Sequence, residues 1–251
     1  MTGSPLLSVC GATRRFGAVT ALDDVSFTVD PGEVVAILGD NGAGKSTLIK
    51  CISGAHRLHG GTIELDGEPV TVSSPAAARA LGIETVYQDL ALFDNLNAID
   101  NFYAGRELAR PHWLPRGLRL LHRRAMGETT ADVVRRLQVG LPGLNGAVGL
   151  LSGGQRQAVA VARAAAFASR LVILDEPTAA LGVRESRQVL DLIVRLRGEG
   201  KAVIVISHAM DHVIEVADRA IVLRRGRKVG ELVPSQETHR DMISLIVGGG
   251  V

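Results

Sequence analysis

Residues 39–47 read GDNGAGKST, a spacing that is typical of a loop that binds phosphate groups. Its glycines let the backbone turn so that successive N–H groups point inward. Lys45 can reach the outer phosphates, and the Ser46 hydroxyl can bind Mg²⁺. An apolar run precedes the loop and a helical pattern follows it, which adds the positive end of a helix dipole. The sequence therefore predicts a phosphate site made of Gly39, Asp40, Asn41, Gly42, Ala43, Gly44, Lys45, Ser46 and Thr47.

Two adjacent carboxylates, Asp175 and Glu176, directly follow the apolar run LVIL. A buried strand that ends there would bring both to the edge of a sheet. Asp175 is suited to hold Mg²⁺, and Glu176 is suited to polarise an attacking water. The alternative reading is an ordinary solvated strand end.

A second candidate anion site begins at LSGGQ, before a long helical pattern that runs to residue 167. Serine is a favourable N-cap, and the glycines leave the helix N-terminus without obstructing side chains. We therefore predict that Ser152, Gly153, Gly154 and Gln155 bind an anion. One chain thus carries two phosphate-type sites that are far apart in the sequence.

Short apolar runs predict the strands that must position these residues. The runs at 33–38, 170–177 and 201–210 are continuous, as in strands buried on both faces, and a helical stretch at 184–200 separates the last two. Residues 22–29 alternate apolar with polar, which indicates a half-buried strand. The alternation of strands and helices predicts an α/β fold with a parallel sheet covered on both sides.

Helical patterning dominates from about residue 90 to 165, with a Pro/Arg-rich interruption at 109–124, and predicts a helical insert lobe. After His208 the pattern indicates two short strands around Arg225-Gly226 and a short terminal helix. No repeat and no long low-complexity tract is present. We therefore expect residues 1–251 to form a single nucleotide-binding domain.

The composition excludes several classes of protein. The 251 residues hold 28 basic and 26 acidic side chains, so the net charge of +2 gives no strong field toward nucleic acid or an anionic membrane. Cys10 and Cys51 lack the spacing of a metal site and fit a reducing compartment. No signal peptide is expected. The most apolar region contains Arg163 and Arg170, which disfavours a membrane-spanning helix.

LSGGQ, the phosphate loop and LVILDEPTAAL together resemble the ATP-binding subunit of the ABC transporter family over nearly the whole chain. The resemblance implies a P-loop NTPase core with N-terminal antiparallel strands, and ATP and Mg²⁺ as cofactors. It implies that Phe16 stacks on adenine, that Gln88 senses Mg²⁺ and the attacking water, and that His208 contacts the γ-phosphate. An ordinary core phenylalanine, a solvent-facing glutamine and a core histidine are the alternatives.

The resemblance also implies a head-to-tail homodimer, in which residues 152–155 of one subunit cover the ATP held by residues 39–47 of the other. One position departs from the family pattern, which usually has Ser-Ala-Leu-Asp where this chain has Ala179-Ala180-Leu181-Gly182. Glycine removes a carboxylate that would reach across the dimer. The departure concerns communication between the two ATP sites and leaves the chemistry-bearing side chains in place.

The segments LGDNGAGKSTLIKCISG, VYQDLALFDNLNAIDNFYAGRE and TAALGVRES are similar to those of bacterial importers of monosaccharides of the ribose, xylose and fructose type. This similarity implies a peripheral subunit at the cytoplasmic face of the inner membrane. Its partners would be a permease, which docks on the lobe after Gln88, and a periplasmic sugar-binding protein. No nucleic-acid partner is expected.

Three other functions stay open at this point. The chain could serve another transport system, with a different substrate or in export. It could be a soluble ABC ATPase that acts on nucleic acid or ribosomes, although no broad basic face or coiled-coil insert is present. It could also be a regulatory module that binds ATP without turnover, which the presence of Glu176 and His208 disfavours.

Overall fold

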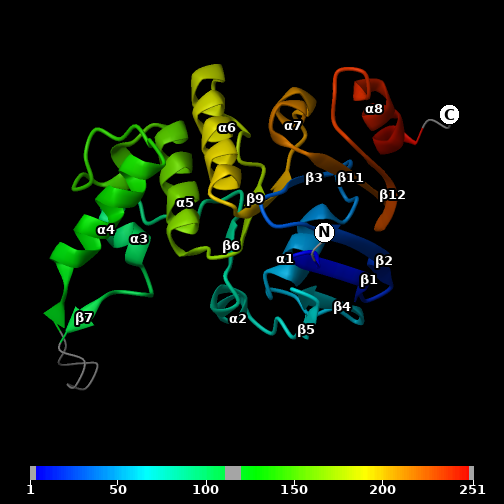
Figure 1. Cartoon of the computed structure of the whole chain (residues 1–251), viewed down its shortest axis with the longest axis horizontal. Coiled ribbons are helices and arrows are strands. Elements are labelled where there is room, and N and C mark those ends of the chain that lie inside the picture. The colour runs from blue at the N-terminus through cyan, green and yellow to red at the C-terminus, as the bar shows by residue number, and fades with distance from the viewer. Residues whose placement is uncertain (1–3, 111–119, 249–251) are drawn as a thin grey trace.

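Within residues 4–110 and 120–248, which the computed structural model describes, a six-stranded sheet forms the centre of the α/β core (Figure 1). The strands β11, β3, β10, β9 and β6 are parallel, and β12 pairs antiparallel at one edge. The buried apolar runs of the sequence form its centre, as predicted. The strand order is β12 (Arg227–Leu232), β11 (Arg219–Arg224), β3 (Val34–Leu38), β10 (Ala202–Ile206), β9 (Leu171–Asp175) and β6 (Ile83–Val86).

A second, antiparallel sheet is built from the N-terminal part of the chain, and this confirms the predicted antiparallel strands. Val25, Phe27 and Val29 are buried while Asp24 and Ser26 are exposed, so the predicted half-buried strand is present. This strand begins at residue 19, three residues earlier than expected. The order is β2 (Val19–Val29), β1 (Leu7–Phe16), β4 (Gly60–Leu65) and β5 (Glu68–Val70).

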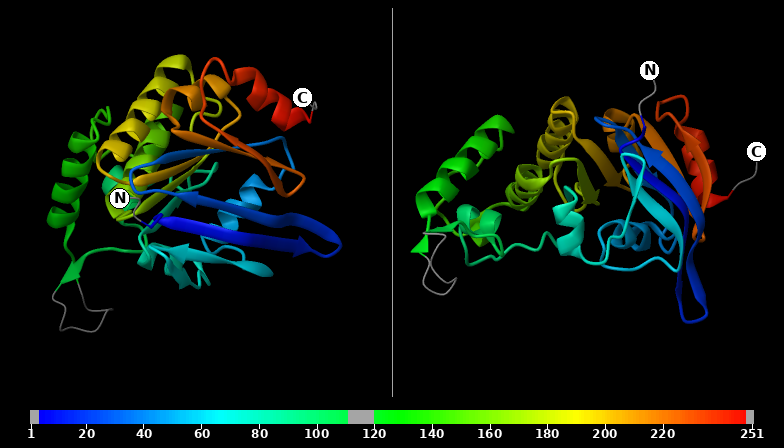
Figure 2. Two further views of the ribbon diagram at one scale, coloured as in Figure 1. Left: turned by 45° about the vertical axis from the view of Figure 1, so that its right-hand side comes forward. Right: turned by 60° about the horizontal axis from the view of Figure 1, so that its bottom comes forward.

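Side chains alternate across β3 and divide the core into layers. Val35 and Ile37 pack toward α1 and the antiparallel sheet. Val34 faces the cluster built by α5 and α6, whereas Ala36 and Leu38 face α7 and α8. Figure 2 shows the N-terminal strands and α1 on one side of the central sheet and α5, α6, α7 and α8 on the other. The helices are α1 (Lys45–Ile52), α2 (Pro75–Ala80), α5 (Gly153–Phe167), α6 (Val183–Gly198), α7 (Met210–Val216) and α8 (His239–Val247).

The helical lobe is built around α3 (Ala98–Tyr103) and α4 (Arg123–Arg136), and both pack on α5. Because α5 also packs on α6 and β6, this helix belongs to the lobe and to the core at once. The structure adds a short antiparallel pair, β7 (Ala109–Arg110) with β8 (Leu120–Leu121), and a 3₁₀ turn, η2 (Val148–Leu150). Residues 111–119 of the predicted interruption lie outside the described residues.

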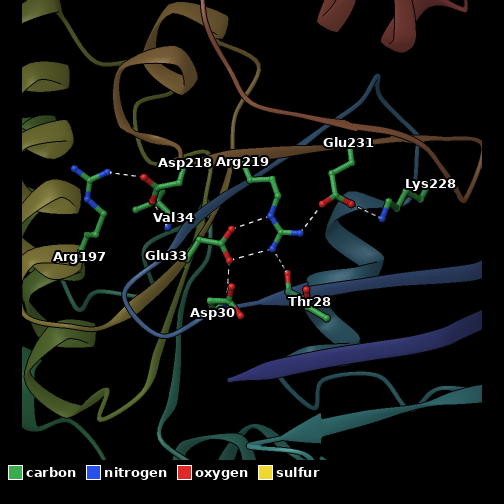
Figure 3. A network of polar contacts seen from close by, with 9 residues as sticks. All are labelled: Thr28, Asp30, Glu33, Val34, Arg197, Asp218, Arg219, Lys228 and Glu231. Atoms are coloured by element: carbon green, nitrogen blue, oxygen red, sulfur yellow. Dashed lines mark hydrogen bonds and ion pairs between the residues drawn. The ribbon is translucent and has the colours of Figure 1, made fainter. Parts of the chain in front are cut away.

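A network of ion pairs ties the sheet together at the amino-terminal ends of β3 and β11 (Figure 3). Arg219 on β11 donates two hydrogen bonds to Glu33, at 2.8 and 3.0 Å, and one to the carbonyl of Thr28 at 2.8 Å. It also pairs with Glu231 on β12 at 2.5 Å, and Lys228 contacts the other oxygen of Glu231. The guanidinium therefore joins the β2–β3 connection to β11 and β12.

Candidate nucleotide site

The carboxyl ends of four neighbouring parallel strands meet at one edge of the central sheet. Ile206 pairs with Ile37 on one side and with Asp175 on the other, so these strands end at nearly the same level. In α/β sheets this edge is where ligands bind. Each of the four strands ends at one of the predicted segments: the phosphate loop after β3, His208 after β10, Asp175 and Glu176 at β9, and Gln88 after β6.

Lys45 lies inside the phosphate loop and is only 6% exposed. Its Nζ donates to the carbonyl oxygens of Gly39, at 2.7 Å, and Asp40, at 3.0 Å. Burial lowers the pKa of Lys45, while the charges of Glu176, Asp175 and Asp40 act in the opposite direction. The ammonium group is thus held at the mouth of the loop, next to the carboxylates of β9.

Two glycines of the loop allow no side chain. Gly39 has φ 147°, and a Cβ there would lie 2.3 Å from the carbonyl oxygen of Leu223. Gly44 has φ 106°, and its Cβ would lie 2.7 Å from the carbonyl oxygen of Ala21. The loop therefore packs directly on β11 and β2, which keeps its backbone N–H groups available for an anion.

Glu176 and His208 contact each other across the ends of β9 and β10. His208 Nε2 lies 2.8 Å from Glu176 Oε1. Glu176 has a left-handed φ of 51°, and its backbone N–H donates to the carbonyl of Ile206 at 3.0 Å. Burial, and secondly the charge of Glu176, raise the pKa of Asp175. Two carboxylates and a histidine are thus concentrated beside Lys45, and the reading of a solvated strand end does not fit.

The oxygen atoms that could hold Mg²⁺ come from different segments. Ser46 and Gln88 are exposed, and Asp175 is half-buried, all at the carboxyl edge. Among the described residues, no three His, Cys, Asp or Glu side chains are grouped to hold a metal ion on their own. Mg²⁺ is usually bound by one or two carboxylates together with substrate phosphates and water, so this sparse set of hard oxygens fits it.

Phe16 lies at the end of β1 and is 41% exposed, so it is not an ordinary core phenylalanine. Its ring forms a T-shaped pair with the ring of His56 at a centroid distance of 5.3 Å, and the Arg14 guanidinium lies 4.7 Å from its centroid. The side chain of His208 is 43% exposed, which also contradicts the core reading of that residue. For Gln88 the solvent-facing alternative remains open.

Ser152 caps α5 as predicted. Its Oγ accepts the backbone N–H of Gln155 at 3.2 Å, and the side-chain oxygen of Gln155 accepts the N–H of Ser152 at 3.0 Å. This reciprocal capping box orders the helix start. Ser152 and Gly153 are exposed, so the start of α5 faces outward.

The chain does not bring its two glycine-lined helix starts together on one side of the sheet. The helix α1 packs on the face of Val35 and Ile37, whereas α5 packs on the opposite face, with Val34. The sites at Lys45 and Ser152 thus belong to different layers (Figure 1).

Glu185 occupies the space beside Gly182, the position that departs from the family pattern. A Cβ at Gly182 would lie 2.6 Å from Glu185 Oε2, and a Cβ at Gly154 would lie 2.3 Å from Glu185 Cγ. A carboxylate therefore lies next to residue 182 although that residue has no side chain. Sequence reasoning missed this placement. The available signal was that Glu185 lies in the first turn of the helix that starts after Gly182.

Sequence reasoning also missed a contact between the loop after Glu176 and the helix after His208. Thr178 Oγ1 and His212 Nδ1 lie 3.0 Å apart. His212 lies in the first turn of the helix that follows His208, and this closeness in sequence was the only available signal. The contact joins two of the segments that carry the site.

The phosphate loop after β3 and the carboxylate pair at β9 define a P-loop nucleotide-hydrolysing protein. The model of the ABC transporter family matches residues 22–179, and the chain belongs to this family as an ATP-binding subunit with ATPase activity.

Known proteins agree with this assignment. The chain is 48% identical to the fructose import ATP-binding protein FrcA of Rhizobium meliloti, over 99% of this chain and 96% of that protein. It is 47% identical to the xylose/arabinose import ATP-binding protein XylG of Sulfolobus acidocaldarius, over 89% and 86%. The ADP conformation of an ATP-binding cassette of an ABC transporter superposes with a TM-score of 0.81 over 97% and 99%, at 24% identity, and shows the fold.

Proposed function

We propose that this chain is the ATP-hydrolysing subunit of an importer of a monosaccharide, and that it works as a head-to-tail homodimer below a membrane permease. The two import ATP-binding proteins named above support the direction of transport and the sugar, because each aligns with most of this chain. The observation that carries the dimer is the placement of Lys45 and Ser152 on opposite faces of the sheet.

The site residues have distinct roles in this proposal. The loop at 39–47 binds the ATP phosphates, Lys45 contacts the outer ones, and Glu176 polarises the attacking water. His208 contacts the γ-phosphate and orients Glu176. Phe16 stacks on adenine, for which its exposed ring is available. The residues that would hold Mg²⁺ are Ser46, Asp175 and Gln88, and the ion would neutralise part of the phosphate charge.

In the homodimer, Ser152, Gly153, Gly154 and Gln155 of one subunit cover the ATP bound to the other. The exposed start of α5 offers backbone N–H groups and the positive end of a helix to the phosphates. ATP thereby favours the closed dimer over the open one, and hydrolysis reverses this preference. The relative movement of the two subunits is passed to the permease.

An exposed apolar surface on the helical lobe supports the permease contact. Phe93 is 54% exposed and Leu150 is 86% exposed. The N–H of Gly149 donates to the carbonyl of Asp94 at 2.9 Å, so the two apolar residues are on adjoining segments. Fully buried Asn101 exchanges hydrogen bonds with both backbone groups of Phe93, at 2.8 and 3.0 Å, and fixes that loop. We propose that a cytoplasmic helix of the permease binds here.

In this proposal the subunit lies at the cytoplasmic face of the inner membrane, with a periplasmic sugar-binding protein as an indirect partner. Among residues 4–110 and 120–248, no helix combines the length and the apolar character needed to cross a membrane. Attachment through a permease accounts for a membrane location without such a helix in this part of the chain.

Cysteine cross-linking tests the dimer. The exposed Cys10 is replaced by serine, while the buried Cys51 is kept. The protein also carries Glu176→Gln, so that bound ATP is not hydrolysed. New cysteines at Asn41 and Ser152 should then form a cross-linked dimer only when Mg-ATP is present. A matched variant with cysteines at Asn41 and exposed Arg124 should not. Absence of the ATP-dependent product, in protein that binds ATP, would contradict the head-to-tail dimer.

The transport role has a separate test. The chain is co-expressed with a candidate sugar permease and reconstituted in vesicles, and ATP hydrolysis is measured with a panel of monosaccharides and a candidate sugar-binding protein. Stimulation by a monosaccharide with its binding protein is expected. Co-purification with ribosomes or nucleic acid, and none with the permease, would favour a soluble ABC ATPase instead.

A further inference from the structure

The segment directly after Gln88 contains two consecutive residues in a left-handed conformation. Leu90 has φ 56° and Ala91 has φ 47°. For residues with a Cβ this conformation is unfavourable, and it persists where the surroundings hold it in place. The structure therefore needs an interaction that holds this pair.

Arg163 supplies that interaction from α5. Its Nη1 donates to the carbonyl oxygen of Ala91 at 2.8 Å, and its Nη2 donates to that of Leu90 at 2.9 Å. The planar guanidinium can bind two adjacent acceptors in a fixed geometry, whereas a lysine ammonium group cannot reproduce this fork. One side chain thus holds both left-handed residues.

The surroundings of Arg163 leave the backbone carbonyls as its partners. Burial lowers the pKa of Arg163 and nearby Arg106 acts in the same direction, while Glu84 opposes them. The carboxylate of Glu84 is bound by both terminal nitrogens of Arg106, at 2.8 and 3.3 Å. A partly dehydrated guanidinium requires acceptors, so loss of the two carbonyl contacts would be unfavourable for Arg163 as well as for the loop.

The same helix begins at Gly153, directly after Ser152. A helix moves largely as one body, so a shift of α5 is passed through Arg163 to a position two residues beyond Gln88. We propose that Arg163 is a positioning residue that holds Leu90 and Ala91 left-handed and thereby sets Gln88 in its working position. This inference rests on the role proposed for Gln88 in ATP hydrolysis.

The test is a double-mutant cycle on ATP hydrolysis. Arg163→Lys should lower kcat at least about tenfold, with KM for ATP changed less than about twofold, because the phosphate loop is untouched. In a Gln88→Ala background, which is itself impaired, Arg163→Lys should lower kcat less than about twofold further. A merely structural role for Arg163 would give independent losses that multiply.

Arg195→Lys is the matched control. Arg195 also joins a core helix to the lobe through a backbone carbonyl, that of Leu137, at 2.5 Å. The kcat of Arg195→Lys should stay within about twofold of the wild-type value. Equal losses of kcat in Arg163→Lys and Arg195→Lys, or multiplicative losses in the cycle, would overturn this inference. The proposed role of Gln88 would not be affected. An unchanged kcat in Gln88→Ala would overturn the proposed role of Gln88 and this inference with it.

A second pair of variants decides the question if Arg163→Lys does not fold. Ala91 is exposed, so its substitution leaves the core intact. Ala91→Pro forces φ to about −65°, whereas Ala91→Gly accepts a positive φ. We expect Ala91→Pro to lower kcat at least about tenfold and Ala91→Gly to retain it. Equal kcat in the two variants would show that the left-handed conformation has no role in hydrolysis.

Discussion

His208 Nε2 and Glu176 Oε1 lie 2.8 Å apart, although the two residues come from the ends of different strands. A second contact supports this pair, because the N–H of Glu176 donates to the carbonyl of Ile206 at 3.0 Å. The carboxylate is therefore positioned by β10 as well as by β9. A shift of either strand end would move the carboxylate that we propose to polarise the attacking water.

Glu176→Gln should retain ATP binding and lower the rate of hydrolysis at least about a hundredfold, because a positioned base contributes roughly 10²–10⁴ in rate. The amide keeps the shape of the side chain but cannot accept a proton. Binding is measured by calorimetry and turnover by phosphate release. Glu128→Gln, a change at an exposed position on α4, serves as the control and should keep normal turnover. Near-normal turnover of Glu176→Gln would remove this residue from the role of base.

Gly182→Asp should lower the free energy of unfolding by about 0.5–1 kcal/mol, since the new side chain meets the carboxylate of Glu185 and places two negative charges side by side. In a Glu185→Ala background, the effect of Gly182→Asp on the free energy of unfolding should reverse in sign. There, aspartate at the N-cap of α6 should stabilise by a few tenths of a kcal/mol relative to glycine. Urea unfolding of the four proteins measures both differences. A loss of stability in both backgrounds would show that Glu185 is not the obstacle.

Glu231→Gln should lower stability by about 0.5–1 kcal/mol at pH 7, and the difference should vanish in acid. The hydrogen bond from Lys228 lowers the pKa of Glu231 in the folded protein, burial opposes this, and Arg219 adds to the lowering. A depressed pKa contributes stability above the ordinary value of about 4.3, and this contribution is lost as the pH falls through the folded value.

Thermal unfolding of wild type and Glu231→Gln between pH 3 and pH 7 measures this dependence. Glu237→Gln removes the same charge from an exposed position and controls for net charge. A Glu231→Gln difference that is constant over the whole pH range would contradict the ion pair as its source.

The parts of the site that sequence predicted depend on local patterns. The phosphate loop requires only a strand, a glycine-rich turn and a helix in succession, and the chain order supplies all three. Asp175 and Glu176 follow a fully apolar run, so their position at a strand end was readable. The capping role of Ser152 was equally local, because the cap and its acceptor are three residues apart.

Other elements escaped the sequence because their pattern is interrupted or their partners are distant. The strand β1 pairs irregularly with β2, with register shifts between Val9 and Arg15, so no clean alternation marks it. The two hydrogen bonds of Arg163 reach the carbonyls of Ala91 and Leu90, which are 72 and 73 positions away in the sequence. No window of sequence contains both ends of such a contact.

The sequence by itself determined that the buried apolar runs become strands, where the phosphate loop lies, and which side chains are candidates for the chemistry of ATP hydrolysis. Only the tertiary structure decided which strand ends adjoin, how Arg163 meets the loop after Gln88, and that Lys45 and Ser152 lie on opposite faces of the sheet. The reason is physical. Periodicity and turn residues report local backbone preference, whereas strand order and helix placement follow from the burial of whole faces against one another.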